Sequence, residues 1–186
     1  MKVSKILFLT ALTAMTAMCS TARADTANKS FIFALQEGPA WLSGGGGSHI
    51  QWGGEVLYNL IGPLEVGAYI NYLGRGTLTD PDTNTKLSAN YLTYGGQAMY
   101  DSSSIVSGTS FGARMGLLHN SLTRTDGITG NEEDHNSTNF SIGPIVEYEV
   151  PINTNFTVGG VFNILFNTGD LSHNDIALMA TLKYYL

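Results

Sequence analysis

Three residues in the second half of the chain are of the types that form the catalytic triad of a nucleophilic hydrolase. His119 and Ser121 stand two residues apart where an alternating segment ends, and Glu133 lies in the polar stretch that follows. A hydroxyl becomes a nucleophile when a histidine takes its proton, and a carboxylate orients that histidine. The three residues are therefore candidates for an esterase, although a His and a Ser at a polar strand end without catalysis are the favoured interpretation.

A second candidate site offers oxygen ligands for a divalent cation. Asp80, Asp82 and Asn84 have the D-x-D-x-N spacing that opens an EF-hand calcium loop. Thr85 occupies the sixth position, where that loop needs glycine, and Tyr91 occupies the twelfth, where it needs a bidentate glutamate. A polar loop is the favoured interpretation and a metal site the weaker one. Nothing in the sequence indicates a cofactor.

Eight segments position these residues, and each alternates between apolar and polar residues with the period of two typical of a β-strand. The last of them, DIALMATLKYYL, continues to the final residue of the sequence. None of them is apolar over enough residues to form a membrane helix. The eight predicted strands cover 29–42, 49–60, 64–75, 89–101, 108–120, 138–150, 155–167 and 175–186.

The stretches between these segments alternate in length. IGP, SSSIVSG and PINT are the shorter ones, and GGGGS, RGTLTDPDTNTKLS, SLTRTDGITGNEEDHNS and TGDLSHN are the longer ones. The longest contains the acidic run 132–135, which we interpret as a solvated loop tip. Because consecutive strands reverse direction, the longer stretches fall at one end of the sheet. Short turns at one end, long loops at the other and an even number of strands are the pattern of a transmembrane β-barrel.

The second face of each segment distinguishes a membrane barrel from a soluble one. In 155–167, for example, Phe156, Phe162 and Phe166 share one face, and the opposite face includes Thr157 and Asn163. Gly, Asn, Thr and Ser replace the Lys and Glu of a water-facing surface, which fits a narrow interior. We therefore predict an all-β fold, an eight-stranded antiparallel up-and-down transmembrane β-barrel. A periplasmic soluble barrel remains an alternative.

Aromatic residues lie on the apolar face at two matching depths. Amphipathic aromatic rings gather where a membrane meets water. Tyrosine also has a high strand propensity, but the shared depth and parity favour two interface girdles. The predicted girdle residues are Tyr58, Tyr100, Tyr148 and Tyr184 at the short-turn end, with Trp41, Trp52, Tyr72 and Phe166 at the other end.

Charged residues on the inward face are expected to pair, because an eight-stranded barrel is filled by its own side chains. Arg114 is the expected partner of Glu147 on the next segment, with Glu55 across the lumen as a further partner. We favour a buried network that plugs the lumen over a gate or ion path. The inward-facing charged residues are Glu55, Glu65, Arg75, Arg114, Glu147, Glu149 and Lys183.

The first 24 residues have the features of a secretory signal peptide. Lys2 and Lys5 precede an apolar stretch that ends in an A-x-A sequence at 22–24. Cys19 offers a lipoprotein alternative, which the bulky Met18 before it disfavours. The predicted domains are a signal peptide over 1–24 and a barrel domain over 25–186.

The barrel domain has few charged residues, and most of them are acidic. Three of the nine Lys and Arg residues fall in the predicted signal peptide, which leaves six bases against fifteen acids and a net charge of −9. This balance argues against a nucleic-acid partner. Charged residues are also sparser than on a soluble surface. The barrel domain contains no cysteine, so packing and backbone pairing must hold it together.

In pattern, 25–186 resembles the small eight-stranded outer-membrane barrels of bacteria, such as the OmpA barrel, OmpX and the opacity proteins. Such chains commonly end on an aromatic residue, whereas here Tyr184 and Tyr185 precede a final Leu186. The resemblance implies a monomer in the bacterial outer membrane, in contact with lipid and lipopolysaccharide and inserted by the barrel-assembly machinery. It further implies a structural or surface-interaction role, with loops that meet an extracellular ligand.

The His119–Ser121 pair is similar to the His-x-Ser pair of outer-membrane lipid A 3-O-deacylases, which are also eight-stranded barrels. In that family Asn follows the Ser, where this chain has Leu122, and the pair lies closer to the C-terminal strand. A lipid-modifying enzyme is therefore an alternative, which requires His119, Ser121 and Glu133 to converge. A small-solute pore is another alternative, which requires a continuous lumen. The favoured function is not enzymatic.

Overall fold

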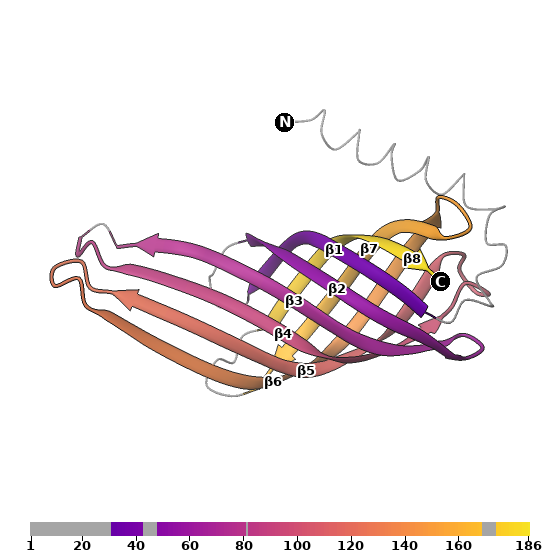
Figure 1. Cartoon of the computed structure of the whole chain (residues 1–186), viewed down its shortest axis with the longest axis horizontal. Coiled ribbons are helices and arrows are strands. Elements are labelled where there is room, and N and C mark those ends of the chain that lie inside the picture. Colours follow the sequence, from indigo (N-terminus) through magenta and orange to yellow (C-terminus); the bar gives the residue numbers. More distant parts are fainter. Residues whose placement is uncertain (1–30, 43–47, 81, 169–173) are drawn as a thin grey trace, which may run out of the picture.

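The computed structural model describes residues 31–42, 48–80, 82–168 and 174–186, and they form a closed β-barrel (Figure 1). Each strand pairs antiparallel with the next, and β1 pairs with β8 to close the sheet. The predicted eight-stranded antiparallel barrel is confirmed, while the predicted signal peptide lies outside the described residues. The strands are β1 (Phe31–Leu42), β2 (Ser48–Ile61), β3 (Leu64–Thr79), β4 (Lys86–Asp101), β5 (Thr109–Thr125), β6 (Glu132–Pro151), β7 (Phe156–Asn167) and β8 (Asn174–Tyr185).

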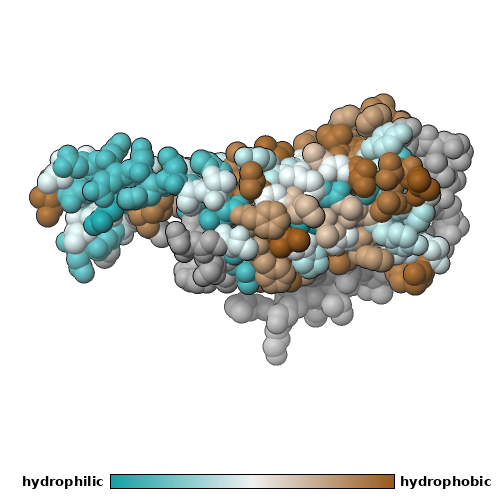
Figure 2. Space-filling view, turned by 90° about the horizontal axis from the view of Figure 1, so that it is seen from below, coloured by the Kyte–Doolittle hydropathy of each residue, from teal (hydrophilic) through white to brown (hydrophobic). Residues whose placement is uncertain are grey.

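The period of two in the sequence corresponds to the inside and the outside of the barrel. Ile32, Leu57 and Val161 point inward and are 0% exposed. Their neighbours along the strands point outward, as Phe33 and Val56 do, with more than 40% of their surface exposed. Figure 2 shows hydrophobic side chains over much of the barrel body and hydrophilic ones over one projecting end. None of the described residues lies in a helix long and apolar enough to cross a membrane.

Glycines on the inward face let neighbouring strands approach closely. A Cβ added to Gly143 on β6 would lie 1.7 Å from the carbonyl oxygen of Ile164 on β7. A Cβ on Gly159 of β7 would lie 1.9 Å from the carbonyl oxygen of Tyr148. Any side chain at these two positions would collide with backbone, so the strongly curved wall of a narrow barrel requires glycine there.

Four strands continue beyond the barrel as an open sheet, which the sequence patterns did not predict. The β2–β3 pairing reaches only Gln51 opposite Leu73, but β3 and β4 stay paired as far as Thr79 and Lys86. On the other side of this sheet, the described β6–β7 pairing begins only at Ser141. Two long hairpins, β3–β4 and β5–β6, therefore project from one end of the barrel (Figure 1).

These hairpins correct two of the predicted loops. The prediction ended strands at 75 and 120 and resumed them at 89 and 138, but β5 and β6 remain paired up to Thr125 opposite Glu132. Outside the barrel neither face needs to be apolar, so the alternation that marks a strand disappears while the backbone ladder continues. The unpaired connections at this end, 80–85 and 126–131, are no longer than 102–108 at the opposite end. The difference between the two ends of the barrel, which was predicted to lie in the lengths of the loops, therefore lies in the lengths of the strands.

Candidate functional site

The proposed catalytic residues do not converge. His119 lies opposite Thr138, and its Nδ1 is 3.1 Å from the Thr138 hydroxyl oxygen. Glu133 lies opposite Arg124, three positions beyond Ser121 and roughly 10 Å along the strand. The esterase hypothesis assumed that 121–137 was a loop able to bring Glu133 back to His119. The stretch is largely a regular ladder instead, so the structure does not bring the three residues of the proposed triad together.

Asp80 stabilises the turn at the tip of the β3–β4 hairpin. Its carboxylate accepts the backbone N–H of Asp82 at 3.0 Å and the hydroxyl of Thr83 at 2.8 Å. These hydrogen bonds, the one from the Asp82 N–H above all, lower the pKa of Asp80. Asn84 adopts a left-handed backbone with φ of 53°. The D-x-D-x-N spacing is thus used to shape a turn, and no three His, Cys, Asp or Glu side chains in the described parts of the chain are placed to hold a metal ion.

The acidic run 132–135 is part of strand β6 and not a loop tip. Glu132 lies opposite Thr125, and Asp134 accepts a hydrogen bond of 2.7 Å from the Thr123 hydroxyl. The tip of this hairpin is 126–131. There Asp126 accepts the backbone N–H groups of Ile128 and Thr129, and these bonds lower its pKa.

A hydrogen-bonded layer around Arg114 fills the middle of the lumen. Arg114 is 0% exposed and forms an ion pair with Glu55, which lies across the barrel on β2. Gln97 accepts the Arg114 Nε–H at 2.7 Å and donates to the second carboxylate oxygen of Glu55 at 2.8 Å. Gln36 also donates to Glu55, and the Arg114 guanidinium carbon lies 4.9 Å from the centre of the Tyr69 ring. These side chains form a layer of charged and amide groups at mid-barrel.

A second layer surrounds Lys183, nearer the short turns. Lys183 forms ion pairs with Glu147 and with Glu149, the latter at 2.8 Å. Glu149 also accepts hydrogen bonds from the Thr157 hydroxyl at 2.7 Å and the Tyr185 hydroxyl at 2.6 Å. Burial of these carboxylates is offset by the ammonium and hydroxyl groups that point at them.

The partner of Arg114 differs from the one predicted first. Arg114 lies opposite Gly143, four residues along β6 from Glu147, which is roughly 13 Å of strand. Glu147 therefore pairs with Lys183, and Arg114 reaches across the lumen to Glu55. Glu65, also predicted to face inward, is 8% exposed and interacts electrostatically with Lys183. The side chain of Arg75 lies outside what the structure describes.

Sequence reasoning missed the amide partners of these ions. Gln36 and Gln97 are 3% and 5% exposed, and each donates to Glu55. Both have inward parity, and Gln97 lies directly opposite Arg114. The exact pairing of β4 with β5 would have identified it.

The predicted aromatic girdle residues lie on the outer face of the barrel. At the short-turn end, each of three tyrosines contacts a phenylalanine of an adjacent strand, with ring centres 4.8–5.4 Å apart. Tyr148 lies at the same end of β6 and is partly exposed. Towards the opposite end, Trp41, Trp52, Tyr72 and Phe166 are 41–56% exposed. Their role at membrane interfaces stays a prediction. The ring pairs are Phe31–Tyr58, Tyr100–Phe111 and Phe156–Tyr184.

Solved structures share this closed barrel. The Ail protein of Yersinia pestis, the attachment invasion locus protein, aligns with a TM-score of 0.60 over 85% of this chain and 97% of its own, at 12% identity. A major outer membrane protein of Thermus thermophilus aligns with a TM-score of 0.62 over 84% and 100% of the two chains, at 14% identity. Neisserial surface protein A aligns with a TM-score of 0.56 over 84% and 97%, at 15% identity.

The chain has the fold of the small outer-membrane β-barrels. At these identities the likeness concerns the fold alone. No protein-family model matches the sequence, and no curated protein matches it either. What this chain binds must therefore be argued from its own residues.

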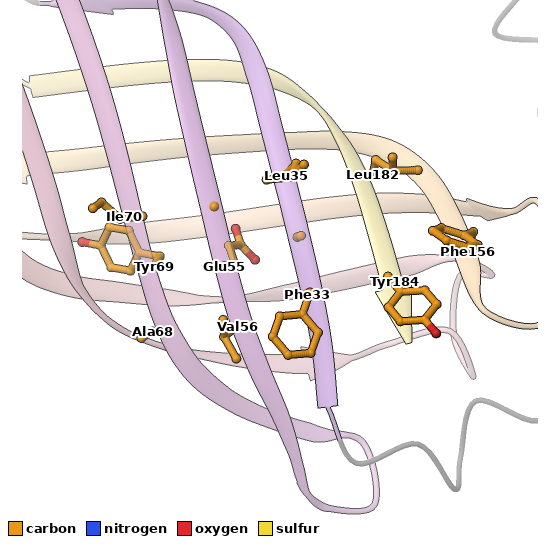
Figure 3. Close-up of a pocket in the computed structure, with 12 residues that line it drawn as sticks. Phe33, Leu35, Glu55, Val56, Ala68, Tyr69, Ile70, Phe156, Leu182 and Tyr184 are labelled. Carbon is orange, nitrogen blue, oxygen red and sulfur yellow. The ribbon is translucent and has the colours of Figure 1, made fainter. Parts of the chain in front are cut away.

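One hollow on the outer wall of the barrel is apolar. It has a volume of about 520 Å³ and lies over β7, β8, β1, β2 and β3 (Figure 3). The depression lies over the small residues Gly54 and Ala68, and the larger side chains of Phe33, Ile70 and Leu182 border it. Apart from the hydroxyl of Tyr184, the outward-facing lining of this depression is apolar, as expected of a wall that faces lipid tails.

The projecting sheet exposes both charged and apolar side chains. Its tips enclose a hollow of about 560 Å³ that includes Arg124, Leu87 and Ile128, and Ile128 is 88% exposed. By sequence, 74–91 and 118–140 together carry six acids and three bases, a net charge of −3. Exposed apolar side chains within a charged rim are typical of a surface that meets another molecule.

Proposed function

We propose that this protein is a bacterial outer-membrane protein that binds a partner outside the cell through the projecting sheet of β3–β6. The observation that carries the proposal is that these strands stay paired beyond the barrel, up to Thr79–Lys86 and Thr125–Glu132. A paired sheet holds its side chains in place before binding, which lowers the entropic cost of recognition. The barrel serves as the anchor, and the Arg114 layer closes its lumen, so we do not favour a pore.

We propose a cationic partner for this sheet. Ail has been crystallised with sucrose octasulfate, a heparin analogue and therefore a polyanion. The net charge of −3 on the projecting sheet would repel such a ligand and attract a basic one. A basic protein segment that places apolar side chains against Ile128 and Leu87 fits both the charge and the exposed apolar groups.

The same proposal places the apolar wall in the outer membrane. Membrane lipid and lipopolysaccharide would contact it, with the tyrosines at the short-turn end at the inner interface. Insertion by the barrel-assembly machinery and a monomeric state belong to this proposal. All backbone groups of a closed barrel are paired within the sheet, so a single chain suffices.

The proposal is tested with a variant that lacks the projecting sheet. Replacing 75–89 and 121–136 each with an Asn-Gly turn leaves Gly74–Asn90 and Asn120–Ser137 as the last strand pairs. The purified variants are placed in phosphatidylcholine vesicles and passed over poly-lysine and heparin surfaces. We expect the full chain to bind poly-lysine in a salt-dependent manner and the shortened chain to lose most of that binding.

The control changes exposed residues at the opposite end of the barrel. Ile105 and Val106 are 78% and 56% exposed in 102–108, and their replacement by alanine should leave poly-lysine binding unchanged. All variants should keep the heat-modifiable gel mobility of a closed barrel. Equal binding by the full and shortened chains would contradict the proposal, and so would binding to heparin instead of poly-lysine.

A further inference from the structure

A small chamber lies in the outer half of the lumen, between the Arg114 layer and the projecting sheet. Its polar lining includes Gln51 of β2, Asn71 of β3 and Asp175 of β8. An apolar rim that includes Leu42 and Leu118 borders the same space. The free volume is about 10 Å³, close to that of one water-sized sphere.

Three polar side chains of this chamber have buried atoms without hydrogen-bond partners in the part of the chain that the structure describes. Gln51, Asn71 and Asp175 are 1%, 2% and 7% exposed. Among the described residues, neither amide atom of Gln51 or Asn71 has a hydrogen-bond partner, and Oδ1 of Asp175 has none either. A buried carboxylate is costly unless a positive charge or a proton compensates for it.

Arg114 is shared between two carboxylates. It donates from Nε to Gln97 and forms its ion pair with Glu55, and it interacts with Asp175 only electrostatically, while its Nη1 has no hydrogen-bond partner among the described residues. No described side chain forms an ion pair with Asp175. The lumen as a whole has an excess of acids, because five described carboxylates face two bases. These residues are Glu55, Glu65, Glu147, Glu149 and Asp175 against Arg114 and Lys183.

We propose that this chamber binds one small monovalent cation through Asp175, Gln51 and Asn71. Carboxylate and amide oxygens are the ligands of hard cations such as Na⁺. One carboxylate neutralises one positive charge, whereas calcium sites take six to eight oxygens, commonly with several carboxylates. A cation can satisfy the carboxylate and both amide oxygens together, whereas a proton on Asp175 can be donated to only one of them.

Cation-dependent stability tests this site on the full chain in detergent. The unfolding temperature is measured in rising NaCl, with choline chloride keeping the ionic strength constant, because choline is too large for a 10 Å³ space. A ligand that binds only the folded state raises the unfolding temperature with its concentration. We expect a rise of roughly 3 °C or more for each tenfold increase in Na⁺ above its dissociation constant.

Two variants separate the site from general salt effects. Asp175→Asn keeps the shape of the side chain and should abolish the difference between Na⁺ and choline. Asp82→Asn removes a carboxylate from an exposed turn and should leave the difference intact. The same unfolding temperature for the unaltered chain in both salts would overturn the proposal. So would a Na⁺ effect that survives in Asp175→Asn.

Diffraction from the unaltered chain provides a readout that does not depend on how the variants fold. Crystals grown with thallium(I), a monovalent ion with strong anomalous scattering, should show a peak between Asp175 and Gln51. A water molecule in that position, with no anomalous signal, would mean that the chamber is only hydrated and would overturn the proposal.

Discussion

Strand β5 carries two arginines ten residues apart, and they differ in burial and in hydrogen bonding. Arg114 is 0% exposed and bonded to Gln97 and Glu55 within the lumen. Arg124 is exposed near the tip of the projecting sheet, opposite Glu133. The first lies inside the closed barrel, and the second lies on an open sheet and is exposed to solvent. The same strands thus form a closed barrel at one end and an open sheet at the other, and the proposed function assigns anchoring to the first and recognition to the second.

Removing the two arginines should give the largest difference between the regions. Arg114→Met leaves Glu55 buried without its ion pair and should lower the free energy of unfolding by about 3–5 kcal/mol. Arg124→Met should change it by no more than about 0.5 kcal/mol, because its side chain is solvated. Urea unfolding in lipid vesicles, followed by circular dichroism, measures both values.

A second substitution sharpens this test. Adding Glu55→Leu to Arg114→Met removes the buried charge that the single variant leaves behind, so much of the lost stability should return. Equal losses in the Arg114→Met and Arg124→Met variants would mean that the lumen is hydrated and that the two regions do not differ.

Adjacent tyrosines in β8 should respond differently, with a smaller effect. Tyr185 points inward and donates a 2.6 Å hydrogen bond to Glu149, whereas Tyr184 points outward and packs on Phe156. Tyr185→Phe should therefore cost about 1.5–3 kcal/mol, the range for a hydrogen bond to a charged group. Tyr184→Phe should be close to neutral in the same urea titration. A reversed order would place β8 one residue out of register.

Substitution of glycines should distinguish the crowded inner face of the barrel from its outer face. Gly143→Ala would place a Cβ 1.7 Å from the Ile164 carbonyl oxygen, and overpacking of this kind costs about 1–3 kcal/mol. The outward-facing Gly96 has its nearest neighbour at 3.7 Å, so Gly96→Ala should cost little. The fraction of each variant that refolds to the heat-modifiable form gives the comparison. Similar losses at both positions would contradict the close approach of β6 and β7.

The smallest effect concerns the tip of the projecting sheet and its response to acid. The pKa of Asp126 is lowered from 3.8 because its carboxylate accepts the N–H groups of Thr129 and Ile128. A lowered pKa stabilises the turn above pH 3.8, and this stabilisation is lost as the pH falls through the folded-state value. The protection of the Ile128 and Thr129 amide protons against exchange should therefore fall below about pH 4, after correction for the intrinsic pH dependence of exchange. In Asp126→Asn the protection should not change with pH in this range. Unchanged protection to lower pH would show that the carboxylate does not hold the turn.

The sequence predicts the barrel better than the projecting sheet for a physical reason. Within the barrel each strand separates an apolar outer wall from the lumen, so the alternation around Lys183, Tyr184 and Tyr185 identifies both faces. Beyond the barrel both faces meet water, and the same backbone ladder carries no alternation. The prediction therefore read 76–88 and 121–137 as loops, and the esterase hypothesis for Glu133 depended on that interpretation.

Ion pairing inside the lumen could be predicted only in part. Parity alone identified Arg114, Glu55 and Lys183 as inward-facing, and the need to compensate buried charge implied that they pair. Which acid meets which base depends on the strand register and on the distance across the barrel. Neither quantity can be read from one sequence, which is why Glu147 was assigned to Arg114 instead of Lys183.

The central claim is that the barrel spans the outer membrane with the projecting sheet outside the cell. Residues 25–186 contain no cysteine, so single cysteines can report on it. Cells that produce Ile128→Cys at the sheet tip or Ile152→Cys at the opposite end are treated with a membrane-impermeant maleimide. We predict that intact cells label Ile128→Cys and that Ile152→Cys is labelled only after the membrane is disrupted. Labelling of both variants in intact cells, or of Ile152→Cys alone, would contradict the account.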